Sequence, residues 1–266
     1  MKKNTFYITF LGTGTSQGVP VIGCSCDVCT SSNPKNHRLR ASVLLSYKDK
    51  NIVIDAGPDF RQQMLTHTIT HVDAILLTHE HKDHIAGLDD IRPFNFARQQ
   101  AMDIFAEQRV IDSVHQEFSY VFKDDPYPGV PLMNLHKITE QPFEFETICI
   151  EPIRVYHWDL PIVGFRIDSC AYITDASQIP THSIEKLRGL EVLVINALRI
   201  QPHYSHFNLE QALHLIAEVK PKRAYLTHIS HLLGDFDDIQ TMLPKNVYLA
   251  YDGLTIEIQK VKTHKN

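Results

Sequence analysis

The sequence predicts an α/β protein whose polar functional residues lie where its strands end. Three observations support this prediction. Short apolar runs typical of strands recur along the 266 residues and alternate with stretches of helical period. Several of these runs end at a histidine or an aspartate, namely Asp55, His79, His157, Asp175 and His228. The tripeptide Leu-Thr-His occurs at two such ends, which hints at two related halves.

The first half of the chain is predicted to combine strands with two helices. Pro58 suits the first turn of a helix over residues 58–67, because its fixed φ is already helical. Apolar residues at helical spacing predict a second helix over residues 107–122. The expected strands cover residues 6–11, 42–47, 52–55 and 73–78.

The second half is predicted to hold one helix, over residues 209–219, among a series of strands. The expected strands cover residues 148–156, 162–167, 171–174, 191–195, 223–227, 247–250 and 254–259. No low-complexity stretch, charge block or flexible linker divides the chain. We therefore expect a single domain over residues 1–266, with pseudo-halves of about 1–145 and 146–266.

Composition and charge narrow the classes of function. Hydrophobic residues make up 43% of the chain and charged residues 21%, as is ordinary for a soluble globular protein. The net charge of −5 provides no broad basic face, so a nucleic-acid partner is disfavoured but not excluded. No apolar run approaches the ~20 residues of a membrane helix, and the N-terminus lacks the apolar region of a signal peptide. We expect a cytoplasmic protein without a membrane partner.

The densest group of candidate metal ligands follows the apolar run of residues 74–77. Six residues hold four of them: His79, His81, Asp83 and His84. Alternate residues of a strand share one face, so His79 and His81 can point the same way as the strand ends. Asp83 and His84 then follow on a turn. Imidazole with carboxylate oxygen suits Zn²⁺, Mn²⁺ or iron, whereas a solvated loop with chance histidines does not account for such dense spacing.

Three of the five cysteines crowd together, at Cys24, Cys26 and Cys29. In a reducing compartment such a pattern indicates metal ligation rather than a disulfide framework. The alternative is a set of redox-sensing thiols. It is disfavoured because the sequence cluster contains no lysine, arginine or histidine to lower a thiol pKa. Cys149 and Cys170 lie in apolar runs and are expected to be small core residues.

The ligand spacing resembles that of a known superfamily. His-x-His-x-Asp-His at residues 79–84, followed by His157, Asp175 and His228, is similar to the ligand order of the metallo-β-lactamase superfamily. The resemblance implies an αββα sandwich, in which two mixed sheets pack face to face with helices outside. It also implies a binuclear metal site at one edge of the sandwich.

A narrower resemblance rests on the two ends of the chain. The segment 10–16 (Phe-Leu-Gly-Thr-Gly-Thr-Ser), the three clustered cysteines and the ending Leu-Thr-His-Ile-Ser-His at residues 226–231 resemble the PhnP-type phosphodiesterases of the carbon–phosphorus lyase pathway. That family is related to tRNase Z. The likeness implies a structural zinc held by Cys24, Cys26, Cys29 and His231.

The superfamily resemblance also implies how the remaining ligands are shared between the two metal ions of the binuclear site. One divalent ion, zinc or manganese, is expected on His79, His81 and His157. The second is expected on Asp83, His84 and His228. Asp175 is expected to bridge the two ions, since the two oxygens of a carboxylate can bind separate cations.

Further roles follow from the same resemblance. Metal coordination lowers the pKa of bound water to roughly 7, which supplies hydroxide for attack on phosphorus, with Asp83 and Asp175 as catalytic ligands. His206 is expected to protonate the leaving group, although it and the nearby His203 are also compatible with a surface role. Asp55 is expected to orient a metal-binding histidine from behind, with a plain strand-end cap as the alternative.

Other residues near these motifs leave two interpretations open. Trp158, beside His157, either walls the substrate pocket or only packs against its neighbours. Arg38, Arg40 and Arg92 either contact a substrate phosphate or serve the structure.

The leading hypothesis is a dinuclear metal-dependent phosphodiesterase that hydrolyses a small, cyclic phosphodiester. The enzyme is expected to form a homodimer. tRNA 3′-end processing is the nearest alternative. Only seventeen residues separate His157 from Asp175, which leaves no room there for a tRNA-gripping arm. Hydrolysis of a β-lactam or a thioester would use the same activated water. A non-enzymatic binding protein is disfavoured because the ligand set is complete.

Overall fold

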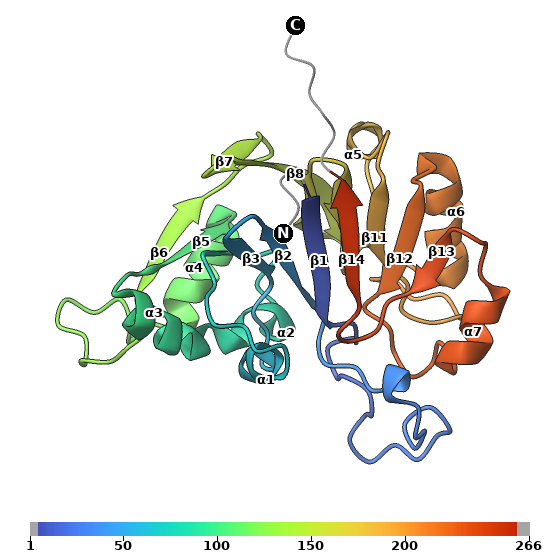
Figure 1. Ribbon diagram of the computed structural model, residues 1–266, viewed down its shortest axis with the longest axis horizontal. Helices are drawn as coiled ribbons and strands as arrows, with labels where there is room; N and C mark the ends of the chain where they lie inside the picture. Colours follow the sequence, from blue (N-terminus) through green and yellow to red (C-terminus); the bar gives the residue numbers. More distant parts are fainter. Residues whose placement is uncertain (1–4, 260–266) are drawn as a thin grey trace, which may run out of the picture.

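Two seven-stranded sheets form the centre of the protein in the computed structural model, which describes residues 5–259. The strands of the first sheet are β1 (Thr5–Gly12), β2 (Ser42–Tyr47), β3 (Lys50–Ile54), β4 (Ala74–Leu76), β5 (Met102–Ala106), β6 (Met133–Lys137) and β14 (Thr255–Gln259). Their order is β14-β1-β2-β3-β4-β5-β6. The C-terminal strand β14 therefore lies beside β1, although most of the chain separates them in sequence (Figure 1).

All strands of the second sheet come from the later part of the chain, residues 143–249. Its strands are β7 (Phe143–Phe145), β8 (Ile148–His157), β9 (Leu160–Ile167), β10 (Cys170–Tyr172), β11 (Val192–Asn196), β12 (Arg223–Thr227) and β13 (Val247–Leu249). They are ordered β13-β12-β11-β10-β9-β8-β7. Both sheets mix parallel and antiparallel pairs. The strand β11 is buried at every position, as its continuous Val-Leu-Val-Ile run predicts for a central parallel strand.

Helices cover the outer faces of both sheets (Figure 1). Those near the first sheet are α1 (Phe60–Thr66), α2 (Lys82–Ile85), the 3₁₀ helix η2 (Ala86–Ile91), α3 (Arg92–Arg98) and α4 (Gln108–Glu117). Those near the second sheet are α5 (Thr181–Lys186), α6 (Leu209–Val219) and α7 (Phe236–Met242). A further 3₁₀ turn, η1 (Pro34–Asn36), lies in the long loop after β1.

Three apolar clusters hold these layers together. The central cluster packs side chains of the two sheets against each other, among them Phe10, Ile54 and Phe165. A second cluster lies beneath α5, α6 and α7, and a third lies beneath α1, η2, α3 and α4. Because each helix layer has its own core against one sheet, the architecture is helix, sheet, sheet, helix. The expected αββα sandwich is therefore confirmed.

Several elements differ from the sequence-based expectations. The strands β5, β6 and β7 and the helices α3, α5 and α7 were not predicted. The helix expected over residues 107–122 ends at Glu117, and the one expected from Pro58 begins at Phe60. Cys149 is exposed rather than in the core, because β8 alternates between its two faces there, whereas Cys170 is buried as expected. Within residues 5–259, no helix is long and apolar enough to cross a bilayer.

Arg154 on β8 links the second sheet to elements of the first half. Its Nη1 donates to Glu107 Oε2 at 2.9 Å, its Nη2 donates to Glu107 Oε1, and its Nε donates to Glu140 Oε1 at 3.0 Å. Glu107 is the residue before α4. The side chains of Arg154 and Glu107 are only 11% and 17% exposed, so this bidentate pair is largely withdrawn from water.

Replacing Arg154 by methionine should lower the free energy of unfolding by about 3 kcal/mol, because two carboxylates lose their buried partner. Urea denaturation followed by circular dichroism measures the difference. Arg188→Met is the matched control, since Arg188 faces solvent in a surface pair with Glu185 and should cost less than about 0.5 kcal/mol. Equal effects of the two substitutions would contradict a special role for the Arg154 pair.

Candidate active site

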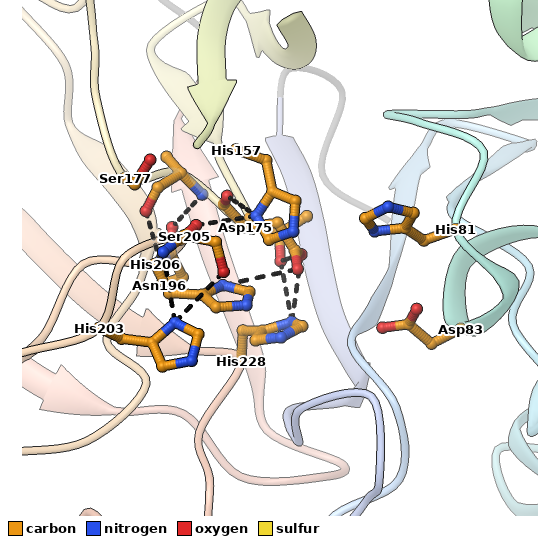
Figure 2. Close-up of polar contacts among 12 residues, drawn as sticks. His81, Asp83, His157, Asp175, Ser177, Asn196, His203, Ser205, His206 and His228 are labelled. Atoms are coloured by element: carbon orange, nitrogen blue, oxygen red, sulfur yellow. Dashed lines mark hydrogen bonds and ion pairs between the residues drawn. The ribbon is translucent and has the colours of Figure 1, made fainter. Parts of the chain in front are cut away.

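Three side chains reach one edge of the sandwich through unusual backbone at strand ends. Asp55 follows β3, Asp175 lies shortly after β10, and His228 follows β12. Their φ angles are 65°, 58° and 53°, in the left-handed region that few residues other than glycine adopt. Such strain tends to be retained where it positions functional groups. Asp175 and His228 point toward the same centre as His81 and Asp83 (Figure 2), and Asp55 contacts His84 from behind.

The histidine-rich segment differs from the expected strand and turn. β4 ends at Leu76, so His79 and His81 lie in a loop, while Asp83 and His84 lie on α2. The strand ends because Thr78 donates its backbone N–H to Asp55 Oδ1 at 2.8 Å instead of to a neighbouring strand. The ligands therefore come from a loop and a short helix.

Asp55 holds this segment in place. Its Oδ2 accepts a hydrogen bond from the Thr78 hydroxyl at 2.8 Å and lies 2.7 Å from His84 Nδ1. All three residues are completely buried. A Cβ on Gly57, two residues later, would lie 2.0 Å from the carbonyl oxygen of Asp83, so the loop after β3 packs directly on α2. Asp55 thus fixes the ring of His84, as the sequence-based hypothesis requires.

One group of candidate ligands consists of Asp83, His84, Asp175 and His228, whose ligand atoms lie within 4.8 Å of one another. His84 Nε2 is 3.1 Å from Asp83 Oδ2 and 3.3 Å from Asp175 Oδ2. His228 Nδ1 is 3.1 Å from Asp175 Oδ2. Yet His84 Nε2 is buried and makes no hydrogen bond to any residue in the described range 5–259. These ligand atoms therefore converge at ion-pair distances, and His84 Nε2 is left free to bind a further partner.

His79, His81 and His157 form a second group beside the first. His79 Nε2 and His81 Nδ1 are 3.0 Å apart, and the ring centroids of His81 and His157 are 5.1 Å apart. His157 Nδ1 lies 2.8 Å from the carbonyl oxygens of Asp175 and Ser205, which leaves Nε2 for another partner. Asp175 belongs to both sides of the site, since it also forms a candidate group with His157 and His206.

The charges of the site favour a cation. Burial acts to raise the pKa of Asp175, but His228 and His84 outweigh it and hold that pKa well below its ordinary value. Burial acts to lower the pKa of His84, but Asp83, Asp55 and Asp175 hold it well above the usual range. Without another cation the carboxylates thus keep a proton on His84. A divalent ion can supply that positive charge and release the proton.

The donor set fits divalent metal ions. Two Zn–N bonds of about 2.1 Å at a tetrahedral angle place their nitrogen atoms about 3.4 Å apart. The separations of 3.0 Å in the pair His79–His81 and 3.1 to 3.3 Å around His84 Nε2 are close to this value. Imidazole and carboxylate are also the donors that zinc and manganese share.

The three clustered cysteines meet His231, as the resemblance implies. His231 Nδ1 is 3.4 Å from Cys24 Sγ and 3.3 Å from Cys26 Sγ, and the ligand atoms of all four residues lie within 4.8 Å of one another. Four donors in this arrangement fit a closed tetrahedral zinc site. Main-chain bonds between Thr15 and Ile229 and between Ile229 and Thr13 bring the two segments together.

The thiol environment differs from the expectation based on the cysteine segment alone. That segment contains no basic residue, but the fold supplies one, because the hydrogen bond from His231 lowers the pKa of Cys26 to about 6. Burial instead raises the pKa of Cys29 to about 11. The thiolate character that a metal ligand needs is therefore present at the exposed end of the cluster.

His206 lies within the site, in the loop before α6. Asn208 begins that helix with a capping box shared with Gln211, which fixes the preceding loop. His206 Nδ1 is 3.7 Å from Asp175 Oδ1, and its ring centroid is 4.6 Å from that of His157. Burial lowers the pKa of His206 to about 3, so its imidazole is neutral before substrate binds.

Sequence reasoning missed the residues that support the ligands. Thr174 donates its hydroxyl to Asp175 Oδ2 at 2.6 Å, and Asn196 makes two hydrogen bonds with the backbone of Ala176. The threonine before each of His79, Asp175 and His228 was visible as a repeated pattern. Asn196 gave no local signal, because it comes from a neighbouring strand.

The candidate phosphate-binding arginines are engaged elsewhere. Arg38 is buried and donates to the Thr13 hydroxyl and to the carbonyl oxygen of Ala250. Arg40 pairs with Asp59, and Arg92 pairs with Asp89. The structure therefore favours their structural interpretation.

Comparison with known proteins agrees with this geometry. Residues 50–229 match the family described as the beta-lactamase superfamily domain. A solved diphosphatase of the PhnP family is 39% identical, with a TM-score of 0.91, over 96% of this chain and 98% of that one. The short form of human tRNase Z is 18% identical, with a TM-score of 0.71, over 94% and 98% of the two chains, which shows a shared fold.

One curated relative is longer than this chain. A Porphyromonas gingivalis protein named octanoyltransferase is 42% identical over 247 residues, which are 92% of this chain but only 50% of that protein. The chain thus spans half the length of this relative. Together, the matched family, the PhnP-family structure and the fold show that the chain belongs to the metallo-β-lactamase superfamily and, within it, to the PhnP family of metal-dependent hydrolases.

Proposed function

We propose that the protein is a phosphodiesterase that uses two divalent metal ions to hydrolyse a small, cyclic phosphodiester. The observation that carries this proposal is the position of Asp175, whose carboxylate borders both groups of candidate ligands. His79, His81 and His157 would hold one ion, Asp83, His84 and His228 would hold the other, and Asp175 would bridge them. Cys24, Cys26, Cys29 and His231 would hold a third, structural zinc ion.

The residues of the chain supply positioning and proton transfer. When bound, a pair of such ions activates water and neutralises charge on the phosphate oxygens. Asp55 keeps His84 in the tautomer whose Nε2 faces the site, because the carboxylate accepts the Nδ1 proton. His206 would protonate the leaving oxygen. A negatively charged phosphodiester would raise the low pKa of this imidazole on binding, so that His206 could take up a proton from solvent and pass it to the leaving oxygen.

The short segment between the candidate ligands His157 and Asp175 supports the proposal of a small substrate. Residues 158–174 form the turn into β9, β9 itself, β10 and their short connections. This segment contains no projecting arm that could grip tRNA. The related PhnP-family structure is described as a diphosphatase, which also cleaves a phosphorus–oxygen bond. The homodimer and the cytoplasmic location stay predictions.

A second candidate is hydrolysis of an acyl thioester. It is favoured by the name octanoyltransferase on the relative that this chain matches over half of its length. The octanoyltransferase activity of that relative can equally reside in the half of its chain that does not match this protein. We therefore rank it below phosphodiester hydrolysis and include it in the test.

Purified protein loaded with Mn²⁺ or Zn²⁺ should hydrolyse bis-p-nitrophenyl phosphate and 2′,3′-cyclic AMP. Nitrocefin, a precursor tRNA and an octanoyl thioester should remain intact under the same conditions. Chelation should abolish the activity, and added metal should restore it, because the water is activated by the ions. Hydrolysis confined to the thioester or to nitrocefin would overturn the proposal.

The substitution His206→Ala should lower kcat about 10²-fold or more, because the leaving oxygen loses its proton donor. Elemental analysis should find the same metal content as in the wild type. His182→Ala is the control, since His182 is 59% exposed and lies outside the site. An unchanged kcat for His206→Ala would remove this residue from the mechanism.

The substitution Cys26→Ser should reduce the metal content from about three ions to about two per chain, since one tetrahedral site loses a ligand. The melting temperature should fall by about 5 °C or more, because the site joins distant segments. Cys149→Ser provides the control, as Cys149 is exposed and remote from the cluster in sequence. Unchanged zinc content and melting temperature would exclude a structural zinc at this place.

A further inference from the structure

Two exposed aromatic side chains flank the candidate active site. Trp158 is 57% exposed and Tyr204 is 71% exposed, although large aromatic side chains usually contribute to a core. Their ring centroids are 5.6 Å apart, with an interplanar angle of 77°. Trp158 directly follows the candidate ligand His157, and Tyr204 precedes His206 by two residues. We call this pair the aromatic corner.

The backbone of Trp158 is held in a costly conformation. Trp158 is the first residue of the two-residue turn that joins β8 to β9, and its φ is 56°. Glycine, asparagine or aspartate is favoured at such a position, and a bulky residue there is a genuine outlier. A hydrogen bond from its N–H to Ser177 Oγ, at 2.8 Å, fixes the turn. Strain that keeps an aromatic ring in solvent indicates a role beyond packing.

The loop that carries Tyr204 is tied to the same site. The ring of His203 stacks on that of Tyr204 at a centroid distance of 4.5 Å. Ser205 donates its backbone N–H to His203 Nδ1, and its carbonyl oxygen lies 2.8 Å from His157 Nδ1. Figure 2 shows His203, Ser205 and His206 gathered beside His157 and Asp175. Both rings of the corner are thus held at a fixed position relative to the candidate ligands.

We propose that the aromatic corner binds the nucleobase of the substrate, which makes the substrate a nucleotide phosphodiester. This inference rests on the proposed function and specifies its substrate class. An exposed, preorganised indole or phenol offers a π-face to any base, and such stacking is worth about 1 to 3 kcal/mol per base, or roughly 5- to 150-fold in affinity. A sugar phosphate without a base has no planar ring for this contact.

Trp158 is the chain's only tryptophan and therefore reports directly on the corner. Adenosine 5′-monophosphate added to the metal-loaded protein should quench its fluorescence with saturation. Ribose 5-phosphate, which has the same phosphate and sugar, should bind about tenfold more weakly and leave the fluorescence almost unchanged. Calorimetry gives both affinities independently of any catalytic activity.

Substitutions separate stacking from a structural role. Tyr204→Leu should weaken binding of adenosine 5′-monophosphate about tenfold and leave binding of ribose 5-phosphate unchanged, whereas Tyr204→Phe should preserve both affinities. Tyr127→Leu is the matched control, since Tyr127 is 80% exposed on the loop between α4 and β6. A loss of affinity for both ligands with Tyr204→Leu would indicate a structural role and overturn the inference.

The two proposals fail in different ways. Hydrolysis of bis-p-nitrophenyl phosphate together with equal affinities for the two monophosphates would overturn the nucleobase site and leave the phosphodiesterase intact. Base-dependent binding that Tyr204→Leu weakens about tenfold, in a protein without phosphodiesterase activity, would support the nucleobase site and overturn the proposed reaction.

Discussion

The buried carboxylate of Asp55 is the contact on which the arrangement of the site depends. One of its oxygens ends β4 by accepting the Thr78 N–H, and the other accepts the Thr78 hydroxyl and faces His84. A buried carboxylate is tolerable only when its hydrogen bonds are complete, and burial here acts to raise the pKa of Asp55. The same group therefore terminates a strand, begins the turn toward α2 and sets the orientation of an imidazole.

The second sheet contributes to the site by a different device. Asp175 and His228 are aimed inward by left-handed backbone, and Thr174 and Asn196 support that conformation through hydrogen bonds. Each sheet alone carries only part of the candidate ligand set. Packing the sheets face to face brings the candidate ligands together, so the central apolar cluster and the arrangement of the edge depend on each other.

Most of the candidate ligands could be predicted from local patterns, because four of them follow the apolar run of residues 74–77 and His157, Asp175 and His228 each end a run of their own. The fold followed from the same spacing through the family resemblance. The supporting contacts could not be predicted from the sequence, because they join residues that lie far apart in it. Arg154 and Glu107 are 47 positions apart, and Trp158 and Tyr204 are 46 positions apart. The strands β6 and β7 are short and half exposed at sheet edges, so their hydrophobic patterns are weak. Cys149 was misplaced because the face it occupies depends on the strand register.

The pairing of β14 with β1 has a consequence for biosynthesis. β1 is synthesised before the other strands of residues 5–259, yet the strand that covers its outer edge comes from residues 255–259. Until those residues emerge, the nascent chain presents an open row of amide and carbonyl groups along β1, and such an edge invites pairing with other chains. The first sheet is therefore completed only after every strand of the second sheet has been synthesised, and products that end before residue 255 would be the species most prone to aggregate.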